Sequence, residues 1–191
     1  LPRAPRTGTE WLGFAGSERQ LPGAVPEPAE LAGLSQAQRI PIINSFRDVW
    51  NGRQGDAGPN GSMALSVGGE DPVFGQRVGY IGSFTYSYSQ ETRRDESRAS
   101  AFPGPTPEQA TPVNVYTGST GRETVLWGGL LNLSTRIGTG TKLSFNNSLS
   151  RSADNEATRL TGFYEQNAIN LDLTRLTFVE RSVRSNQLLG E

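Results

Sequence analysis

Three neighbouring carboxylates are the residues in this sequence that come nearest to a metal site. They are Asp154, Glu156 and Glu165. A calcium-binding loop needs Asp or Asn at alternate positions, a glycine at its sharp turn and a closing Glu. The stretch around Asp154 has neither that full spacing nor the glycine, so we expect no metal site there.

Nucleophilic catalysis has no better support. A serine nucleophile needs an adjacent base, but Ser62, Ser83 and Ser134 belong to a chain with no His and no Cys. Lys142 is the one lysine that a Ser–Lys pair could use. The stretch Gly138–Gly140 fits a hairpin turn and does not match a phosphate-binding loop. We therefore expect no enzyme, no catalytic residue and no cofactor.

The composition limits the partners and the class of protein. The 191 residues carry a formal net charge of -1, which gives no electrostatic case for nucleic acid. Only 34% of them are hydrophobic, against roughly 45–50% in soluble domains on a slightly different residue set. Alternating strands lower this fraction without loss of order, because a barrel wall needs apolar side chains on one face only. No apolar run reaches the length of about 20 residues that a transmembrane helix needs.

Residues 124–151 show how the strands must position their side chains. Five residues of the first half share one parity: Val125, Trp127, Leu131, Leu133 and Ile137. The other parity carries Leu126, Gly128, Asn132, Ser134 and Arg136. After the Gly138 turn, Leu143, Phe145 and Leu149 alternate with polar residues. Alternation over about 9–11 residues, joined by a tight turn, is what a membrane-spanning β-hairpin needs, with one face toward lipid and the other toward water.

The rest of the chain extends this pattern. We expect an all-β fold, an antiparallel up-and-down meander that forms part of a transmembrane β-barrel. Strands are predicted at about 60–70, 77–98, 123–137, 141–160 and 168–190. A long loop is predicted at 99–122 and a long polar connection at 152–170, whereas the turns near Asp71 and Gly138 are short; outer-membrane barrels alternate their connections in this way. Leu176 and Phe178 differ in parity from Val179 and Val183, which predicts a bulge or a strand boundary there.

Residues 1–59 are rich in Pro, Gly and polar residues and predict a long irregular region, which the resemblance described below implies to be on the outer side of the membrane. One short helix is expected at 28–40, because Pro28 suits a first helical position; alternatively, Ser35 caps a second, shorter turn. Trp11, Phe14 and Trp50 either hold this loop in its fold or contact a ligand. Because the chain begins at Leu1 without a readable signal peptide and ends within a strand pattern, we expect a piece of a longer protein.

In several segments the chain resembles a TonB-dependent outer-membrane receptor. The segments that carry the resemblance are Glu10–Phe14 with Gly16, Arg19, Leu21 and Pro22; Ser45-Phe46 to Trp50; Asn60–Gly69; Val125–Ser134; Lys142–Asn147; and Val179–Val183. They follow one another in order over nearly the whole chain. The resemblance implies the first part of a plugged barrel of about 22 strands that imports a scarce nutrient across the bacterial outer membrane. The plug and its TonB-binding segment are not in this sequence.

The expected partners are the lipid bilayer, the remainder of the barrel and its plug, and the TonB complex through that plug; the substrate is left open. The lipid-facing residues are predicted to be Tyr80, Phe84, Tyr86, Val125, Trp127, Leu131, Leu133, Phe145 and Leu149. The lumen-facing residues are predicted to be Asn132, Ser134, Arg136, Ser144 and Asn146.

Two other readings of the same pattern are open. One is a β-rich binding module at the cell surface, such as a sandwich whose apolar face packs on a second sheet. The other is a structural subunit that joins other chains through its unpaired strand edges.

Overall fold

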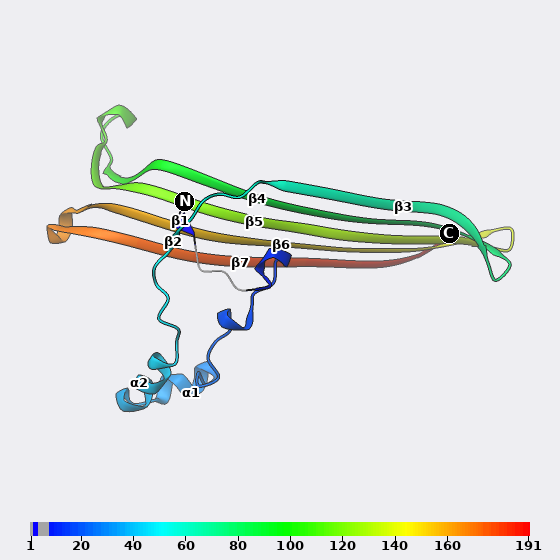
Figure 1. Ribbon diagram of the computed structural model, residues 1–191, viewed down its shortest axis with the longest axis horizontal. Helices are drawn as coiled ribbons and strands as arrows, with labels where there is room; N and C mark the ends of the chain where they lie inside the picture. The colour runs from blue at the N-terminus through cyan, green and yellow to red at the C-terminus, as the bar shows by residue number, and fades with distance from the viewer. Residues whose placement is uncertain (1, 4–7) are drawn as a thin grey trace.

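The computed structural model describes residues 2–3 and 8–191 and consists of one long antiparallel sheet with an N-terminal segment against it (Figure 1). The sheet contains β3 (Gly61–Val73), β4 (Gln76–Phe102), β5 (Thr111–Ile137), β6 (Thr141–Tyr164) and β7 (Ile169–Gly190), in that order. Each strand pairs antiparallel with the next along the chain. The predicted all-β, up-and-down meander is confirmed.

The connections at the two ends of the sheet differ in length. Residues 74–75 and 138–140 make tight turns at one end. Residues 103–110, which include the short 3-10 helix η3 (Pro107–Gln109), and residues 165–168, with η4 (Glu165–Asn167), connect the strands at the other end. The predicted alternation is therefore present, but both longer connections are shorter than expected.

The predicted loop at 99–122 is wrong over most of its length. Residues 99–102 still belong to β4, and residues 111–122 belong to β5. Glycines and a proline suggested a break, but Gly118 lies where the sheet is so tight that a Cβ would collide with the carbonyl of Arg159. Asp95 and Asn114 adopt positive φ angles of 54° and 52° next to two shifts in register. Bulges therefore absorb the irregularity within the ladder.

The last two strands also differ from the prediction. Strand β6 continues to Tyr164, so that the connection after it is short. Strand β7 pairs with β6 in one unbroken register, without the predicted bulge or strand boundary. Leu176 and Phe178 face the N-terminal segment, since Leu176 lies near Gly52 and the ring of Phe178 lies under Arg19. Both faces of the sheet can thus carry apolar residues at this level.

The N-terminal region is folded rather than irregular throughout. It contains β1 (Pro2–Arg3), which pairs with β2 (Arg53–Gln54), the 3-10 helices η1 (Glu10–Leu12) and η2 (Ser17–Arg19), and the helices α1 (Pro28–Gly33) and α2 (Gln36–Asn44). The single predicted helix at 28–40 is therefore two helices. Ser35 begins the second one through a capping box with Gln38, and this second helix is the longer of the two.

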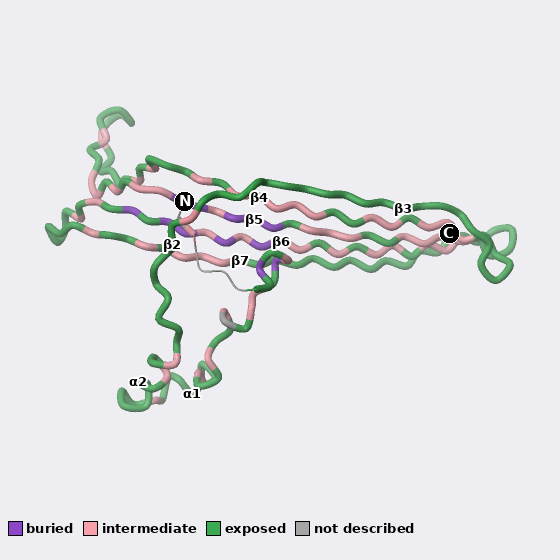
Figure 2. Tube along the Cα trace, viewed as in Figure 1, coloured by how far each residue is buried: buried purple, intermediate pink, exposed green. Residues whose placement is uncertain are grey.

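The small core lies where the N-terminal region covers the sheet. Figure 2 shows the buried residues gathered on β5 and β6 beneath that region, while most of the sheet is half-buried or exposed. The buried apolar side chains are Val125, Ala153 and Ala157 on the covered face, and Leu160 on the opposite face. Helices α1 and α2 project away from the sheet (Figure 1). Within the described residues, every helix is too short or too polar to cross a membrane.

Candidate functional site

The strand register gathers the predicted apolar residues on one face of the sheet. Directly opposed residues of neighbouring strands point to the same side, and Tyr86 is opposite Trp127, which is opposite Arg151. All nine residues predicted to meet lipid lie on this face. It also carries Met63, Leu65, Val67 and Leu188, which the predicted set did not include. We call the part of this face from the Trp127 row to the Ile137 row the apolar band; it includes Leu131, 47% exposed.

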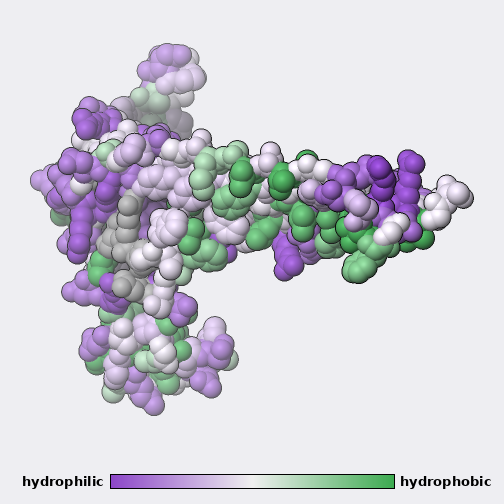
Figure 3. All heavy atoms as spheres, turned by 45° about the vertical axis from the view of Figure 1, so that its right-hand side comes forward, coloured by the Kyte–Doolittle hydropathy of each residue, from purple (hydrophilic) through white to green (hydrophobic). Residues whose placement is uncertain are grey.

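The height of the apolar band matches a bilayer. Along β5 the band runs from Trp127 to Ile137, about ten residue steps, or roughly 33 Å at about 3.3 Å per residue. With strands tilted by about 40°, this length gives a height of roughly 25 Å, the height of the apolar band on transmembrane barrels. Figure 3 shows apolar atoms along the part of the sheet that projects toward the tight turns, and polar atoms near its end.

The opposite face of the same strands is polar and built from small side chains. The pairs Asn132 with Asn146 and Ser134 with Ser144 are directly opposed across β5 and β6. Arg136 is opposed to Lys142 near the tight turn. All five residues predicted to line the lumen therefore share one face, which is the face that Trp127 does not use. Large apolar residues interrupt it on three strands: Ile81 on β4, Leu126 and Leu130 on β5, and Val183 and Leu189 on β7.

The apolar band becomes more polar toward β7. Asn147 donates a hydrogen bond to Asn186 at the level of Leu131. Arg184 lies opposite Leu149, one row nearer to Trp127. The amide pair satisfies part of its own hydrogen-bonding capacity, which lowers the cost of an apolar environment.

A short segment crosses the sheet at the Trp127 end of this band, which we call the upper end. We call residues Trp11–Ala15 the strap. Each of four successive strands holds it with one side chain. Three of these side chains donate to strap carbonyls: the Tyr86 hydroxyl to Trp11 at 2.7 Å, the Trp127 indole to Leu12 at 2.7 Å and the Arg151 guanidinium to Gly13 at 2.7 Å. From β7, the Glu180 carboxylate accepts from the Ala15 N–H at 2.9 Å.

Gly13 gives the strap a backbone conformation that other residues rarely adopt. Its φ of +74° is in the left-handed region that favours glycine. A Cβ at this position would lie 3.5 Å from that of Ala153 and 3.8 Å from a methyl group of Val125, which is ordinary contact. The requirement for glycine is therefore conformational rather than steric.

Aromatic stacking adds to the hold on the strap. The Phe14 ring lies 6.3 Å from Trp127, and the Arg151 guanidinium lies 3.9 Å from the centre of the Phe14 ring. Trp127 also contacts Phe84 on the neighbouring strand at 6.2 Å. Such pairs stabilise by about 0.5–1.5 kcal/mol each.

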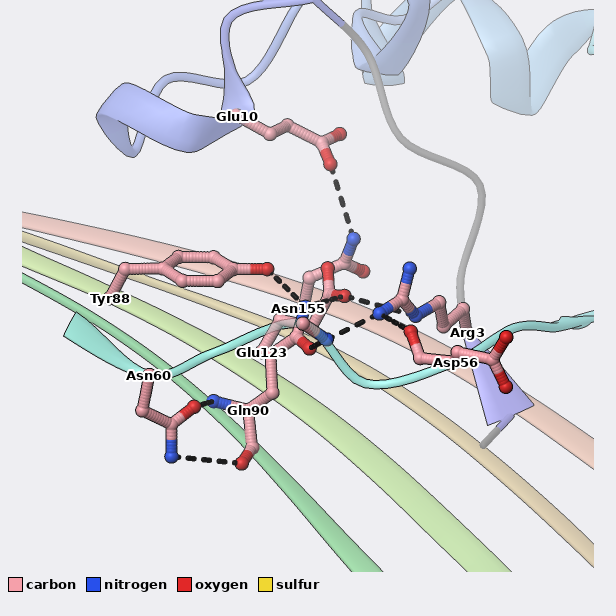
Figure 4. A network of polar contacts seen from close by, with 9 residues as sticks. Arg3, Glu10, Asp56, Asn60, Tyr88, Gln90, Glu123 and Asn155 are labelled. Atoms are coloured by element: carbon pink, nitrogen blue, oxygen red, sulfur yellow. Dashed lines mark hydrogen bonds and ion pairs between the residues drawn. The ribbon is translucent and has the colours of Figure 1, made fainter.

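A polar network lies beneath and beside the strap (Figure 4). The buried Glu10 carboxylate accepts from Asn155 at 3.1 Å and from Arg19 at 2.5 Å. On the neighbouring strands, Gln90 donates to the buried Glu123 at 2.9 Å, and Arg3 lies 3.5 Å from the same carboxylate. These charges lie directly above the apolar rows, so the chemistry of the face changes abruptly at the strap.

The strap changes the expectation for three residues that were predicted to face lipid. Val125 is only 5% exposed, because Gly13 lies on it; it contacts protein, and its assignment to lipid is wrong. Trp127 and Tyr86 are on the predicted face, but their polar atoms bind the strap. The strap residues lie far from β5 in the sequence, so the alternation pattern alone gave no sign of this cover.

The three aromatic residues predicted to hold the loop or contact a ligand lie in different places. Phe14 packs on Trp127 and Arg151, as a residue that fixes the loop would. Trp11 and Trp50 are 60% and 70% exposed, and they lie on different parts of the N-terminal region. The structure does not bring the three together into one site.

Of the three carboxylates singled out in the sequence, Asp154 forms ion pairs on the polar face, outside the apolar band. Asp154 bridges Arg122 at 3.0 Å and Arg181 at 3.5 Å and accepts from the Thr124 hydroxyl at 2.8 Å. Burial raises the pKa of Asp154, but the hydrogen bonds and nearby cations outweigh this effect and lower the pKa below its ordinary value. No group of three or more potential metal ligands occurs in residues 2–3 and 8–191.

Three comparisons with known proteins identify no relative. No family model matches the chain, no curated protein matches it, and no solved structure matches it.

Proposed function

We propose that this chain is part of the wall of a transmembrane β-barrel in the bacterial outer membrane, of the TonB-dependent transporter type, and that the whole barrel imports a scarce nutrient. The apolar band faces lipid, and the small polar residues of the other face line the lumen. The barrel continues beyond the two edges of this sheet, and a plug closes it. The family assignment is supported by the resemblance of the segments quoted above.

The observation that carries the proposal is the separation of side chains between the two faces over four strands in register, β3 to β6. Leu131 and Leu133 lie on one face, and Asn132 and Ser134 lie on the other at the same level. A bilayer and an aqueous lumen need this contrast. A soluble sandwich needs a second sheet on the apolar face. In the described part of the chain, the sole other sheet is the β1–β2 pair, which lies above the band.

The open edges support a larger assembly. Among the described residues, β3 pairs with β4 alone and β7 with β6 alone. Unpaired backbone N–H and C=O groups are costly in lipid, so a wall must close on itself or on other chains. The five strands are therefore a part of a barrel and not a complete pore. A subunit that joins other chains through these edges is the alternative, and it shares the lipid-facing band.

Site-directed spin labelling tests the proposal. The chain has no cysteine, so Leu133→Cys and Ser134→Cys each give a single label at nearly the same depth on opposite faces. The labelled chain is studied in outer-membrane fractions of cells that produce it. Oxygen concentrates in lipid, whereas a nickel chelate stays in water, so the relaxation of the label by each reagent reports its surroundings.

We expect the label at Leu133→Cys to be relaxed by oxygen and little affected by the nickel chelate, with the reverse at Ser134→Cys. A label at Leu133→Cys that neither reagent reaches is buried in protein, which would favour the sandwich. Recovery of the chain as a folded monomer without detergent would also contradict a membrane wall.

A further inference from the structure

The strap lies where a membrane barrel meets the lipid headgroups. The row of Tyr86, Trp127 and Arg151 is the highest row of the apolar band, and the next rows carry Glu180, then Glu123 and Asn155. This change from apolar to charged rows marks the boundary between hydrocarbon and water on such a wall. The strap crosses the strands at that boundary.

The strap occupies the polar atoms that would otherwise face the headgroups. Tyr and Trp collect at membrane boundaries because the ring is apolar and the O–H or N–H can bind water or headgroups. Here the Tyr86 hydroxyl and the Trp127 indole N–H both donate to strap carbonyls. The strap therefore satisfies these donors in place of lipid headgroups. The outer surface of the strap then takes the place of the sheet at the boundary between hydrocarbon and water.

That outer surface is aromatic. Trp11 is 60% exposed and Phe14 is 39% exposed. Phe14 is fixed in place from below by Trp127 and Arg151. Two exposed rings at this level, one of them packed on the sheet, match the composition of an interfacial belt.

We propose that the strap is a membrane-contact element: Trp11 and Phe14 insert into the headgroup region of the bilayer and replace Trp127 and Tyr86 in the aromatic belt. The proposal rests on the proposed function, because it requires the apolar band to lie in lipid. The partner is a lipid surface. A second protein on the strap is an alternative that the test separates.

Tryptophan fluorescence tests the proposal, because the chain has three tryptophans. Trp50→Phe retains Trp11 and Trp127, whereas Trp11→Phe retains Trp50 and Trp127. Trp50 is a matched control, since it is exposed to a similar degree. Each variant is reconstituted within the assembled barrel into phosphatidylcholine vesicles in which the lipid is brominated near the top of its acyl chains, and iodide serves as the quencher in water.

We expect bromolipid to quench the Trp50→Phe variant about twofold more strongly than the Trp11→Phe variant, because a boundary Trp lies within reach of the bromines. Iodide should quench the two variants in the reverse order. Equal bromolipid quenching, or iodide access to Trp11 equal to that of Trp50, would overturn the proposal. Protection of Trp11 from both quenchers would mean that protein covers the strap, and would also overturn it.

A further variant separates failure of this proposal from failure of the proposed function. In a chain with both Trp11→Phe and Trp50→Phe, Leu131→Trp adds a ring in the middle of the apolar band. The double variant without Leu131→Trp gives the quenching of Trp127 alone. If bromolipid quenches the Leu131→Trp variant more strongly than this background and Trp11 is not quenched, the wall is in lipid and the strap is not. If Leu131→Trp adds no quenching, the membrane wall itself is wrong, and the strap proposal fails with it.

Discussion

Leu131 and Leu130 are neighbours on β5 that test the membrane wall directly. They are 47% and 38% exposed, but they point to opposite faces. Leu131 lies in the apolar band. Leu130 lies opposite Ser83 and Ser148 on the polar face. An arginine at each position therefore has nearly the same depth and a similar exposure but different surroundings.

In a soluble sheet both substitutions replace a half-exposed leucine and should have small effects, within about 0.5 kcal/mol of each other. In a bilayer, Leu131→Arg should destabilise the fold by roughly 2–4 kcal/mol, because the charge faces hydrocarbon near the midplane. This is a change of roughly 30-fold to 900-fold in the folded-to-unfolded ratio at 1.36 kcal/mol per tenfold step. Leu130→Arg should cost less than about 1 kcal/mol, because its side chain reaches water in the lumen.

The assay is reversible urea unfolding of the assembled barrel in phosphatidylcholine vesicles, followed by the change in electrophoretic mobility between folded and heated samples. The amount of each variant in the outer-membrane fraction of cells gives a second, independent reading. Equal losses for the two arginines would contradict the separation of faces by lipid and water. A larger loss for Leu130→Arg would mean that the lumen and lipid faces are assigned the wrong way round.

Three further predictions concern the strap, the polar face and the helices. Gly13→Ala should cost about 1 kcal/mol from its left-handed backbone alone and speed hydrogen exchange of the strap amides, whereas Gly8→Ala, in open space with an ordinary φ, should not. Because the pKa of Asp154 is lowered, its ion pairs should stabilise the fold fully above its ordinary pKa of about 3.9 and lose that contribution as the pH falls below it; acid titration of unfolding should show less of this loss in Asp154→Asn. Ser35→Ala should cost about 1 kcal/mol in helix α2 through the lost cap, seen as faster exchange of its first amides.

Alternation over residues 124–151 was sufficient to predict the hairpin and both of its faces. A period of two needs only local information, and the tight Gly138 turn fixes the register that the two halves share. The same rule placed Tyr80 and Phe84 of the neighbouring strand β4 on the face that carries Leu133, and the register agrees. Most of the architecture and the candidate lipid face could therefore be predicted from the sequence.

The failures have a different origin. Residues 111–122 contain glycine and proline, which usually mark a break, but here neighbouring strands on both sides impose the extended conformation. The cover on Val125 depends on Gly13, which lies more than a hundred positions earlier in the chain. A pattern of single residues contains no information on which distant segment will lie on a face. The strap and the four side chains that hold it could therefore not be found in this way.

Four side chains from four strands hold the strap, and these contacts also constrain the order of folding. In a meander each strand pairs only with its neighbours, so a slip of one strand by one residue would leave the other pairs intact while turning its side chains to the wrong side. The strap touches β4, β5, β6 and β7 together, and the bond between Ala15 and Glu180 spans 165 residues. Such distant contacts form late. The first-made part of this chain is thus expected to dock last, and only when four strands are correctly aligned.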